Sequence, residues 1–134
     1  MMGQVKGKDT KLEQAVSKAL WKKGYRYRKN GLTLFGKPDI AIKKYNVVIF
    51  IDSCFWHGCT THFKLPSKNQ DYWNKEIRRN IERDSEVSRF YNINSWTLIR
   101  VWEHDLKNHF DLCIYFICRE IIKAKYFKNR KLTN

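Results

Sequence analysis

A run of five apolar residues, 47–51, constrains the fold of this chain more than any other feature, because polar residues bound it on both sides. Its length and its β-branched composition predict a strand. Residues 40–42 predict a second strand just before it, joined to it through residues 43–46. Residues 96–102 and the short half-buried alternation of 25–28 predict two further strands. A β-sheet is therefore the centre of the expected fold.

A first helix is predicted to precede the sheet, from residue 10 to residue 23. Thr10 and Glu13 have the spacing of a capping box, in which each side chain satisfies a backbone N–H at the start of a helix. Gly24 follows the last helical position and is typical of a helix end.

Two later stretches also predict helices. A helix is predicted over residues 71–92 that presents Asp84 near the core side, because one helical stripe holds Trp73, Ile77, Ile81 and Asp84. The very apolar residues 112–122 predict a buried closing helix, and the basic end, 123–134, is expected to fray.

The resulting order is helix, three strands, helix, strand, helix. It predicts an α/β (α+β) fold with a small mixed β-sheet flanked by helices. A length of 134 residues suits one hydrophobic core. We therefore expect a single domain over residues 1–134.

The charge of the chain indicates its partners. Lys and Arg number 27 against 13 Asp and Glu, a formal net charge of +14. Such a field attracts polyanions, and nucleic acid leads the candidates. A ribosomal component or another basic protein would share this charge, so it indicates binding and not catalysis.

No stretch reaches the roughly 18 apolar residues that cross a bilayer, and residues 1–11 lack the apolar core of a secretory signal. We therefore expect a soluble cytoplasmic protein. In a reducing compartment its four cysteines are expected to act as ligands or core residues, not as disulfides.

A cluster of metal-ligand residues occupies a stretch with no periodicity. Cys54, Cys59 and His62 lie within nine residues, and thiolate and imidazole are the ligands that zinc prefers. The alternative interpretation is that these residues are unconnected, as buried thiols and a surface imidazole. His57 lies among them and suits either metal binding or proton transfer.

A structural zinc site needs a fourth ligand from elsewhere. His104 is the expected one, because it follows the last predicted strand. Cys113 and Cys118 are the competitors, although a free cysteine in an apolar helix usually acts as a small core residue.

Two carboxylates end or begin predicted strands. Asp39 follows Pro38 and precedes one strand, and Asp52 ends the next. Two adjacent strands could bring both acids to one edge of the sheet, where they would suit Mg²⁺. Glu13 and Asp84 could supply outer ligands or a base, though each acid alone also has an ordinary role in a turn, a cap or a solvated helix.

The chain resembles the very-short-patch-repair (Vsr) DNA mismatch endonucleases, a zinc-containing branch of the PD-(D/E)XK nuclease superfamily. Six segments in the family's order carry the resemblance: 8–13, 24–28, 36–40, 54–59, 80–84 and 101–103. The Cys-Phe-Trp-His core that starts at Cys54 is the most specific of them.

The resemblance implies a restriction-endonuclease-like fold and a catalytic site. Asp39 would bind the catalytic Mg²⁺ together with the main-chain carbonyl of Ile51. His57 would be a catalytic histidine, supported by Glu13 and Asp84.

It also implies roles for aromatic residues and for the cluster of ligands. Phe55, Trp56 and Trp73 match aromatics that such enzymes insert into DNA beside a T:G mismatch. A structural Zn²⁺ would be held by the ligand set Cys54, Cys59, His62 and His104.

The chain departs from the family pattern in several places. Asp52 stands where the family has a second active-site histidine, and it is either a second metal ligand or a silent replacement. Cys54 stands where the wider superfamily has lysine. Cysteine and histidine are exchanged at Cys59, His62 and His104, which preserves ligand chemistry.

We therefore expect a Mg²⁺-dependent endonuclease that nicks one strand of duplex DNA, at T:G mismatches in very short patch repair. It is expected to act as a monomer on double-stranded DNA, with mismatch-repair or methyltransferase and restriction proteins as candidate partners. Two alternatives stay open: a zinc-stabilised DNA-binding module without catalysis, and an RNA-binding or RNA-processing protein.

Overall fold

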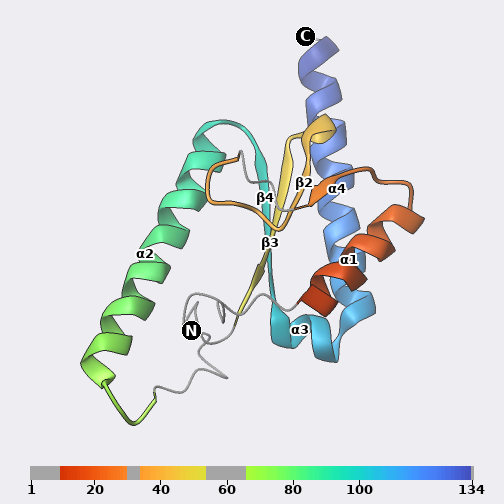
Figure 1. Cartoon of the computed structure of the whole chain (residues 1–134). Coiled ribbons are helices and arrows are strands. Elements are labelled where there is room, and N and C mark those ends of the chain that lie inside the picture. The colour runs from red at the N-terminus through yellow and green to blue at the C-terminus, as the bar shows by residue number, and fades with distance from the viewer. Residues whose placement is uncertain (1–9, 30–33, 54–65, 134) are drawn as a thin grey trace.

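A computed structural model of the chain describes residues 10–29, 34–53 and 66–133 (Figure 1). Its elements, in chain order, are α1 (Thr10–Lys22), β1 (Arg28–Lys29), β2 (Ile40–Ile42), the 3-10 turn η2 (Lys43–Tyr45), β3 (Val47–Asp52), α2 (Gln70–Ile93), β4 (Thr97–Trp102), α3 (Glu103–Asn108) and α4 (Phe110–Thr133).

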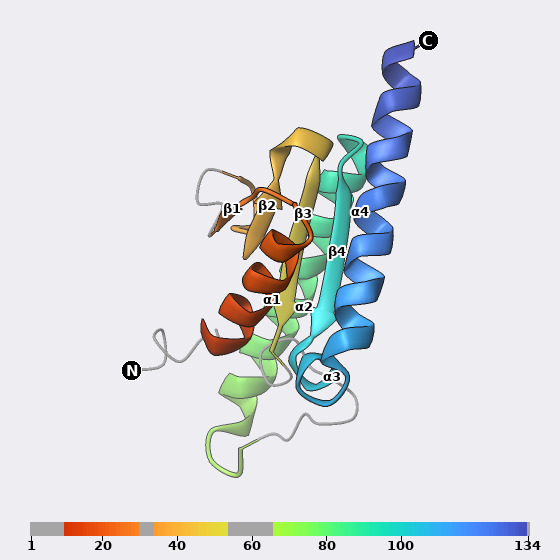
Figure 2. The ribbon, with the colours of Figure 1, turned by 90° about the vertical axis from the view of Figure 1, so that its right-hand side faces the viewer.

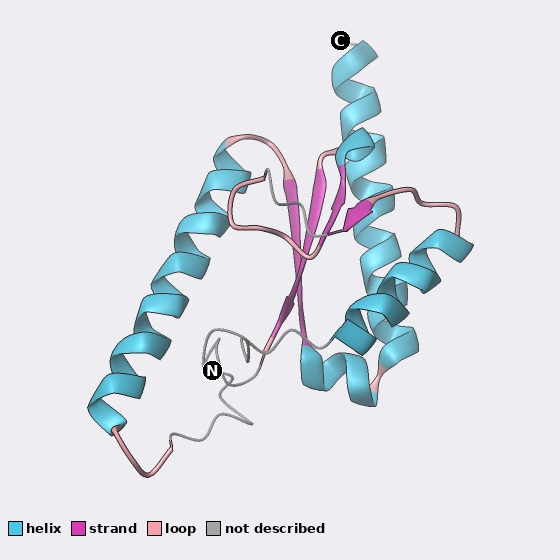
Figure 3. Cartoon of the chain, in the orientation of Figure 1, coloured by secondary structure: helices cyan, strands magenta, loops and turns pink. Residues whose placement is uncertain are grey.

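The four described strands form one mixed sheet in the order β1-β2-β3-β4 (Figure 3). β2 runs antiparallel to both β1 and β3, whereas β4 runs parallel to β3. The parallel register runs from Val47 opposite Thr97 to Asp52 opposite Trp102. A mixed sheet with helices around it confirms the predicted fold class.

Helices cover both faces of the sheet. Figure 1 shows α2 on one side and α1 with α4 on the other, and Figure 2 shows the sheet between them. Successive residues of a strand point to opposite faces. Ile49 therefore packs in the core on the α1 and α4 side, whereas Val48 and Phe50 pack against α2. The apolar run 47–51 is continuous because both of its faces are buried.

Of residues 25–28, which were predicted to form a strand, only Arg28 pairs with the sheet. Gly24 takes a left-handed φ of 94°, and the following residues fold back onto the end of α1. The Tyr25 N–H donates to the Leu20 carbonyl, and the Tyr27 hydroxyl donates to the Ser17 carbonyl at 3.0 Å. The strand begins only at Arg28, because Tyr25 and Tyr27 before it form hydrogen bonds with carbonyls of α1.

The stripe predicted on α2 is only partly buried. Ile77, Val87 and Tyr91 pack against the sheet, but Ile81 is 44% exposed. Beyond Ile77 the buried positions follow spacings of ten and fourteen residues, which drift around the helix away from Ile81. Ile81 therefore lies off the buried face, whereas Asp84 of the same predicted stripe is half-buried and faces Arg100 of the sheet.

The closing helix is longer and more amphipathic than its composition predicted. α4 extends from Phe110 to Thr133, beyond the range 112–122 that the apolar composition predicted. Its inner face buries Ile114, Ile117 and Ile121, while Leu112 and Tyr115 on its outer face are exposed. The period of 3.6 residues lets one face serve the core while the other meets solvent. Among the described residues, no helix is long and apolar enough to cross a membrane.

Candidate active site

Asp39 is held at the point where β2 begins. Its backbone N–H donates to the Ile49 carbonyl at 3.0 Å, and its buried carboxylate accepts the Ile51 N–H through Oδ2 at 2.7 Å. The bonded N–H of Ile51 lies on β3, two residues beyond Ile49, which is the last residue of β3 that pairs with β2. The carboxylate of Asp39 is brought beside the peptide of Ile51, the residue expected to offer a main-chain oxygen to the same cation.

Asp52 ends β3 at the same edge of the sheet, as the order of the strands predicted. Its side chain points to the α2 face, where Arg100 of β4 donates to its Oδ1 at 2.9 Å. Arg100 also reaches Asp84 of α2, at 3.4 Å to the main-chain oxygen and 3.8 Å to the carboxylate. The two acids are therefore brought together by one guanidinium.

The sequence reasoning missed Arg100. A signal for it exists in β4, where a charged residue lies between the buried Ile99 and Val101. Its guanidinium carbon lies 4.7 Å from the centre of the Phe50 ring, a cation–π geometry. A cation placed on a covered sheet face requires acidic partners, but the sequence does not say which acids they are.

Glu13 lies in the first turn of α1 and is buried. A glutamate is seldom buried to this extent unless it is paired, so the burial of Glu13 is more than a role in capping the helix requires. Figures 1 and 2 place the first turn of α1 toward the end of the sheet where β3 ends. The turn of α1 that contains Glu13 therefore lies near that end, on the face of the sheet opposite to α2.

Most of the expected zinc site lies outside the described residues. Three of the expected ligands, Cys54, Cys59 and His62, lie within residues 54–65, which are not among the described residues. His57, Phe55 and Trp56 lie in the same range. In the described segments 10–29, 34–53 and 66–133, no group of three His, Cys, Asp or Glu side chains is arranged to hold a metal.

His104 lies in the first turn of α3, directly after β4. Its ring stacks on Trp102 with centroids 6.0 Å apart, and its Nε2 lies 3.3 Å from Asp105. Because Trp102 pairs with Asp52, β3 and β4 end at the same edge of the sheet. His104 therefore lies at the edge from which the chain continues into residues 54–65.

The two competing cysteines are free thiols on α4. Cys113 is buried in the apolar core, and Cys118 packs against that core. Burial raises the pKa of both thiols; Asp105 raises that of Cys113 further, and Lys23 partly offsets the effect at Cys118. Zinc binds the thiolate, so a raised pKa favours the core role for both residues.

Trp73 is the described member of the three aromatics expected to contact DNA. It is half-buried in the first turn of α2, and its ring meets Tyr72 edge-on at 5.0 Å between centroids. Tyr72 itself is exposed. Two aromatic rings therefore stand together at the start of α2, well separated from the C-terminal end of that helix (Figure 1).

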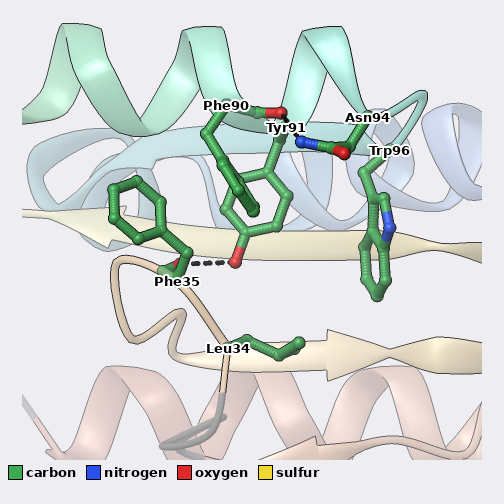
Figure 4. Close-up of a pocket in the computed structure, with 6 residues that line it drawn as sticks. All are labelled: Leu34, Phe35, Phe90, Tyr91, Asn94 and Trp96. Carbon is green, nitrogen blue, oxygen red and sulfur yellow. Dashed lines mark hydrogen bonds between the residues drawn. The ribbon is translucent and has the colours of Figure 1, made fainter.

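An open pocket of about 530 Å³ lies at the C-terminal end of α2 (Figure 4). Its lining is largely aromatic and apolar: Leu34, Phe35, Phe90, Tyr91, Asn94 and Trp96. The Tyr91 hydroxyl donates to the Phe35 carbonyl, and the Asn94 side-chain amide donates to the Phe90 carbonyl at 2.7 Å. None of the candidate catalytic residues lines this pocket, so the depression is separate from the site at Asp39.

Comparisons with known proteins agree with the resemblance drawn from the motifs. The family model described as "DNA mismatch endonuclease Vsr" matches residues 1–62. The nicking enzyme V.NaeI of Lentzea aerocolonigenes is 46% identical over 101 residues, which are 72% of this chain and 61% of that enzyme.

Two further relatives are covered over most of their length. The nicking enzyme V.NmeAIP of Neisseria meningitidis serogroup A is 40% identical over 121 residues, 90% of this chain and 82% of that enzyme. The DNA mismatch endonuclease Vsr of Escherichia coli K12 is 32% identical over 108 residues, 79% of this chain and 69% of that enzyme.

Proposed function

This chain belongs to the Vsr family of DNA mismatch endonucleases, and on that premise we propose that it nicks one strand of duplex DNA at a T:G mismatch. The observation that carries the proposal is the bond from the Ile51 N–H to the Asp39 carboxylate. It holds a buried acid beside the peptide expected to provide a second oxygen ligand.

The donor set at this edge fits a divalent cation. Carboxylate and main-chain oxygens are the ligands that Mg²⁺ prefers, and Mg²⁺ usually keeps waters and substrate phosphate oxygens beside them. Asp39 and the Ile51 carbonyl would hold Mg²⁺, which would supply charge stabilisation at the scissile phosphate and orient the attacking water. The backbone bond to Asp39 Oδ2 fixes the direction of the carboxylate before DNA binds.

His57 is proposed to move a proton during cleavage, and Glu13 and Asp84 are proposed to support the site. Imidazole exchanges protons near neutral pH, which suits a general acid or base. Glu13 and Asp84 lie on helices that cover opposite faces of the sheet.

Structural zinc is proposed to order the loop after β3. Cys54, Cys59 and His62 would be three ligands, and His104 the fourth. The parallel ending of β3 and β4 supports this choice, because it brings His104 to the edge where residue 53 ends the described part of that segment.

DNA binding is proposed to combine charge with aromatic insertion. The net charge of +14 attracts the phosphate backbone without regard to sequence. Phe55, Trp56 and Trp73 would enter the base stack beside the mismatch. We propose that the enzyme acts as a monomer in the cytoplasm, with repair or restriction proteins as partners.

The test is nicking of end-labelled duplexes that contain T:G or T:A at one position, in Mg²⁺, mapped on each strand. Asp39→Asn should lower the rate of nicking by about a thousandfold or more while folding and DNA binding are retained. Asp111→Asn, an exposed acid in the first turn of α4, is the matched control and should nick like the unchanged protein.

A folded, zinc-loaded protein that binds these duplexes but never nicks them would instead be the non-catalytic DNA-binding module. Faster cleavage of matched RNA duplexes would support the RNA-processing alternative. Asp39→Asn that nicks at the normal rate would remove Asp39 from the site.

Zinc content separates the candidate fourth ligands. Elemental analysis should give about one zinc per chain, and His104→Ala should lower that content. Cys113→Ala and Cys118→Ala should leave it unchanged, because both side chains belong to the core or its margin. Zinc loss in either cysteine variant, with His104→Ala fully loaded, would reverse the assignment.

A further inference from the structure

Arg100 occupies a position that gives it access to both acids of the α2 face. It pairs in register with Phe50, so its side chain leaves the sheet on the same face as Phe50 and Asp52. Its guanidinium lies over the Phe50 ring and donates to Asp52 Oδ1 at 2.9 Å. A second nitrogen of the same guanidinium faces Asp84.

The bond to Asp52 is the stronger of the two ion pairs. The Asp52 side chain is only 8% exposed and its N–O distance is 2.9 Å, whereas Asp84 is 26% exposed at 3.8 Å. A buried carboxylate needs a partner of opposite charge, and a guanidinium at hydrogen-bond distance is a strong one. Arg100 is therefore a strong partner that holds Asp52 on the α2 face.

The two acids at the end of β3 face different groups. Asp39 is directed to the Ile51 peptide by a backbone bond, and Asp52, the next residue after Ile51, is directed to α2 by Arg100. Exchange of Arg100 for a cation would make Asp52 a second carboxylate at this edge. Such an exchange would bring another negative charge to the cation and would tighten its binding.

We propose that Arg100 is a positioning residue that holds Asp52 out of the cation site, so that Asp39 is the acid that binds the cation. The inference rests on the proposed function, in which Asp39 holds a divalent metal. Arg100 thereby lowers the affinity of the site for the metal before DNA binds. Because Asp52 is not a ligand, coordination positions stay open for phosphate oxygens and water.

The test measures Mn²⁺ binding by the zinc-loaded protein without DNA, by isothermal titration calorimetry. Arg100→Gln removes the positive charge but keeps a donor for Asp52, and it should lower the Kd for Mn²⁺ by about tenfold. Arg100→Lys keeps the charge and should stay within about twofold of the unchanged protein.

The double variant Asp52→Asn with Arg100→Gln replaces the ion pair by a neutral pair of similar shape. If Asp52 is outside the cation site, the double variant should bind Mn²⁺ within about twofold of the unchanged protein, with no net change of charge in the pair. A Kd that rises about tenfold or more would show that Asp52 already binds the metal, and it would overturn the proposal. This variant decides the matter even if Arg100→Gln alone fails to fold.

Asp39→Asn separates failure of this inference from failure of the proposed function. Unchanged Mn²⁺ binding in Asp39→Asn would contradict the metal site itself. Loss of binding in Asp39→Asn, together with an unchanged Kd in a folded Arg100→Gln, would keep the metal site and reject the role of Arg100.

Discussion

The two faces of the sheet differ in the kinds of side chain that pack on them. The face under α1 and α4 is a large aliphatic core that includes Ile40, Ile49 and Ile117. The face under α2 is smaller, and its apolar part gives way to Arg100 and Asp52 toward the end of β3. One face can supply stability in proportion to the apolar area it buries, while the other keeps charges in place at the edge of the sheet.

Substitution in the aliphatic face should have the largest effect on stability. Ile117 is fully buried on α4, and Ile117→Ala should lower the free energy of unfolding by about 3–4 kcal/mol. Urea unfolding followed by circular dichroism measures it. Ile122 lies on the same helix at 57% exposure, and Ile122→Ala should cost less than about 0.5 kcal/mol. Similar costs at the two positions would contradict the assignment of the two sides of α4.

Removal of the Arg100 guanidinium on the α2 face should lower the free energy of unfolding by a smaller amount. Arg100→Met leaves Asp52 buried without its guanidinium, and we expect a loss of about 2 kcal/mol at neutral pH, measured by the same urea unfolding. The loss should shrink when Asp52→Asn is added, because the side chain that lost its guanidinium is then neutral. A double variant no more stable than Arg100→Met would show that the cost comes from lost packing on Phe50.

Close packing between α2 and the loop before β2 should have an intermediate effect. A Cβ at Gly36 would lie 2.8 Å from both methyl carbons of Val87, and its φ is 77°. Gly36→Ala should cost about 1–2 kcal/mol in thermal unfolding. Gly24→Ala is the control, with a similarly positive φ of 94° and no atom near the new methyl. The difference between the two variants isolates the contact with Val87.

The hydroxyl of Tyr91 should contribute the smallest of these effects. Tyr91→Phe loses the bond to the Phe35 carbonyl and should cost about 1 kcal/mol at pH 8. Burial raises the pKa of Tyr91, so the unfolded chain loses this proton first as pH rises. The stabilisation is complete below about pH 10 and declines above it.

Urea unfolding at about pH 8 and about pH 10.5 tests that sign. The difference between the unchanged protein and Tyr91→Phe should be smaller at the higher pH. Tyr115→Phe, at an exposed position of α4, is the control and should change the free energy of unfolding little. A Tyr91 effect that grows with pH would contradict burial as the cause of the shift.

Local patterns were sufficient to predict much of the fold. The apolar runs at 40–42 and 47–51 became β2 and β3, and the spacing of Thr10 and Glu13 predicted a helix start where α1 begins. The position of Asp39 between Pro38 and a strand was also readable, and the local antiparallel pairing of β2 with β3 puts it beside the end of β3. Short-range signals thus predict the central strands and the place of one acid of the candidate site.

The features that escaped prediction depend on contacts between distant segments. Arg100 meets Asp52 only because β4 adopts one parallel register beside β3, and no local pattern fixes that register. Ile81 is apolar at a helical spacing, yet the direction in which α2 crosses the sheet leaves it exposed. The composition of α4 could not separate a buried helix from one with an exposed apolar side. The roles of the cluster at 54–62 stay predictions.

The parallel pairing of β3 with β4 also bears on how the molecule folds. Val47 meets Thr97, so the ladder joins residues fifty positions apart, and the helix α2 lies between them. Contacts of such high sequence separation form slowly, because a long loop must close before they contribute. The β2–β3 hairpin is local and is expected to form earlier. During synthesis Asp39 can therefore reach Ile51 before residue 100 has left the ribosome, and Asp52 acquires its guanidinium only when the sheet is completed.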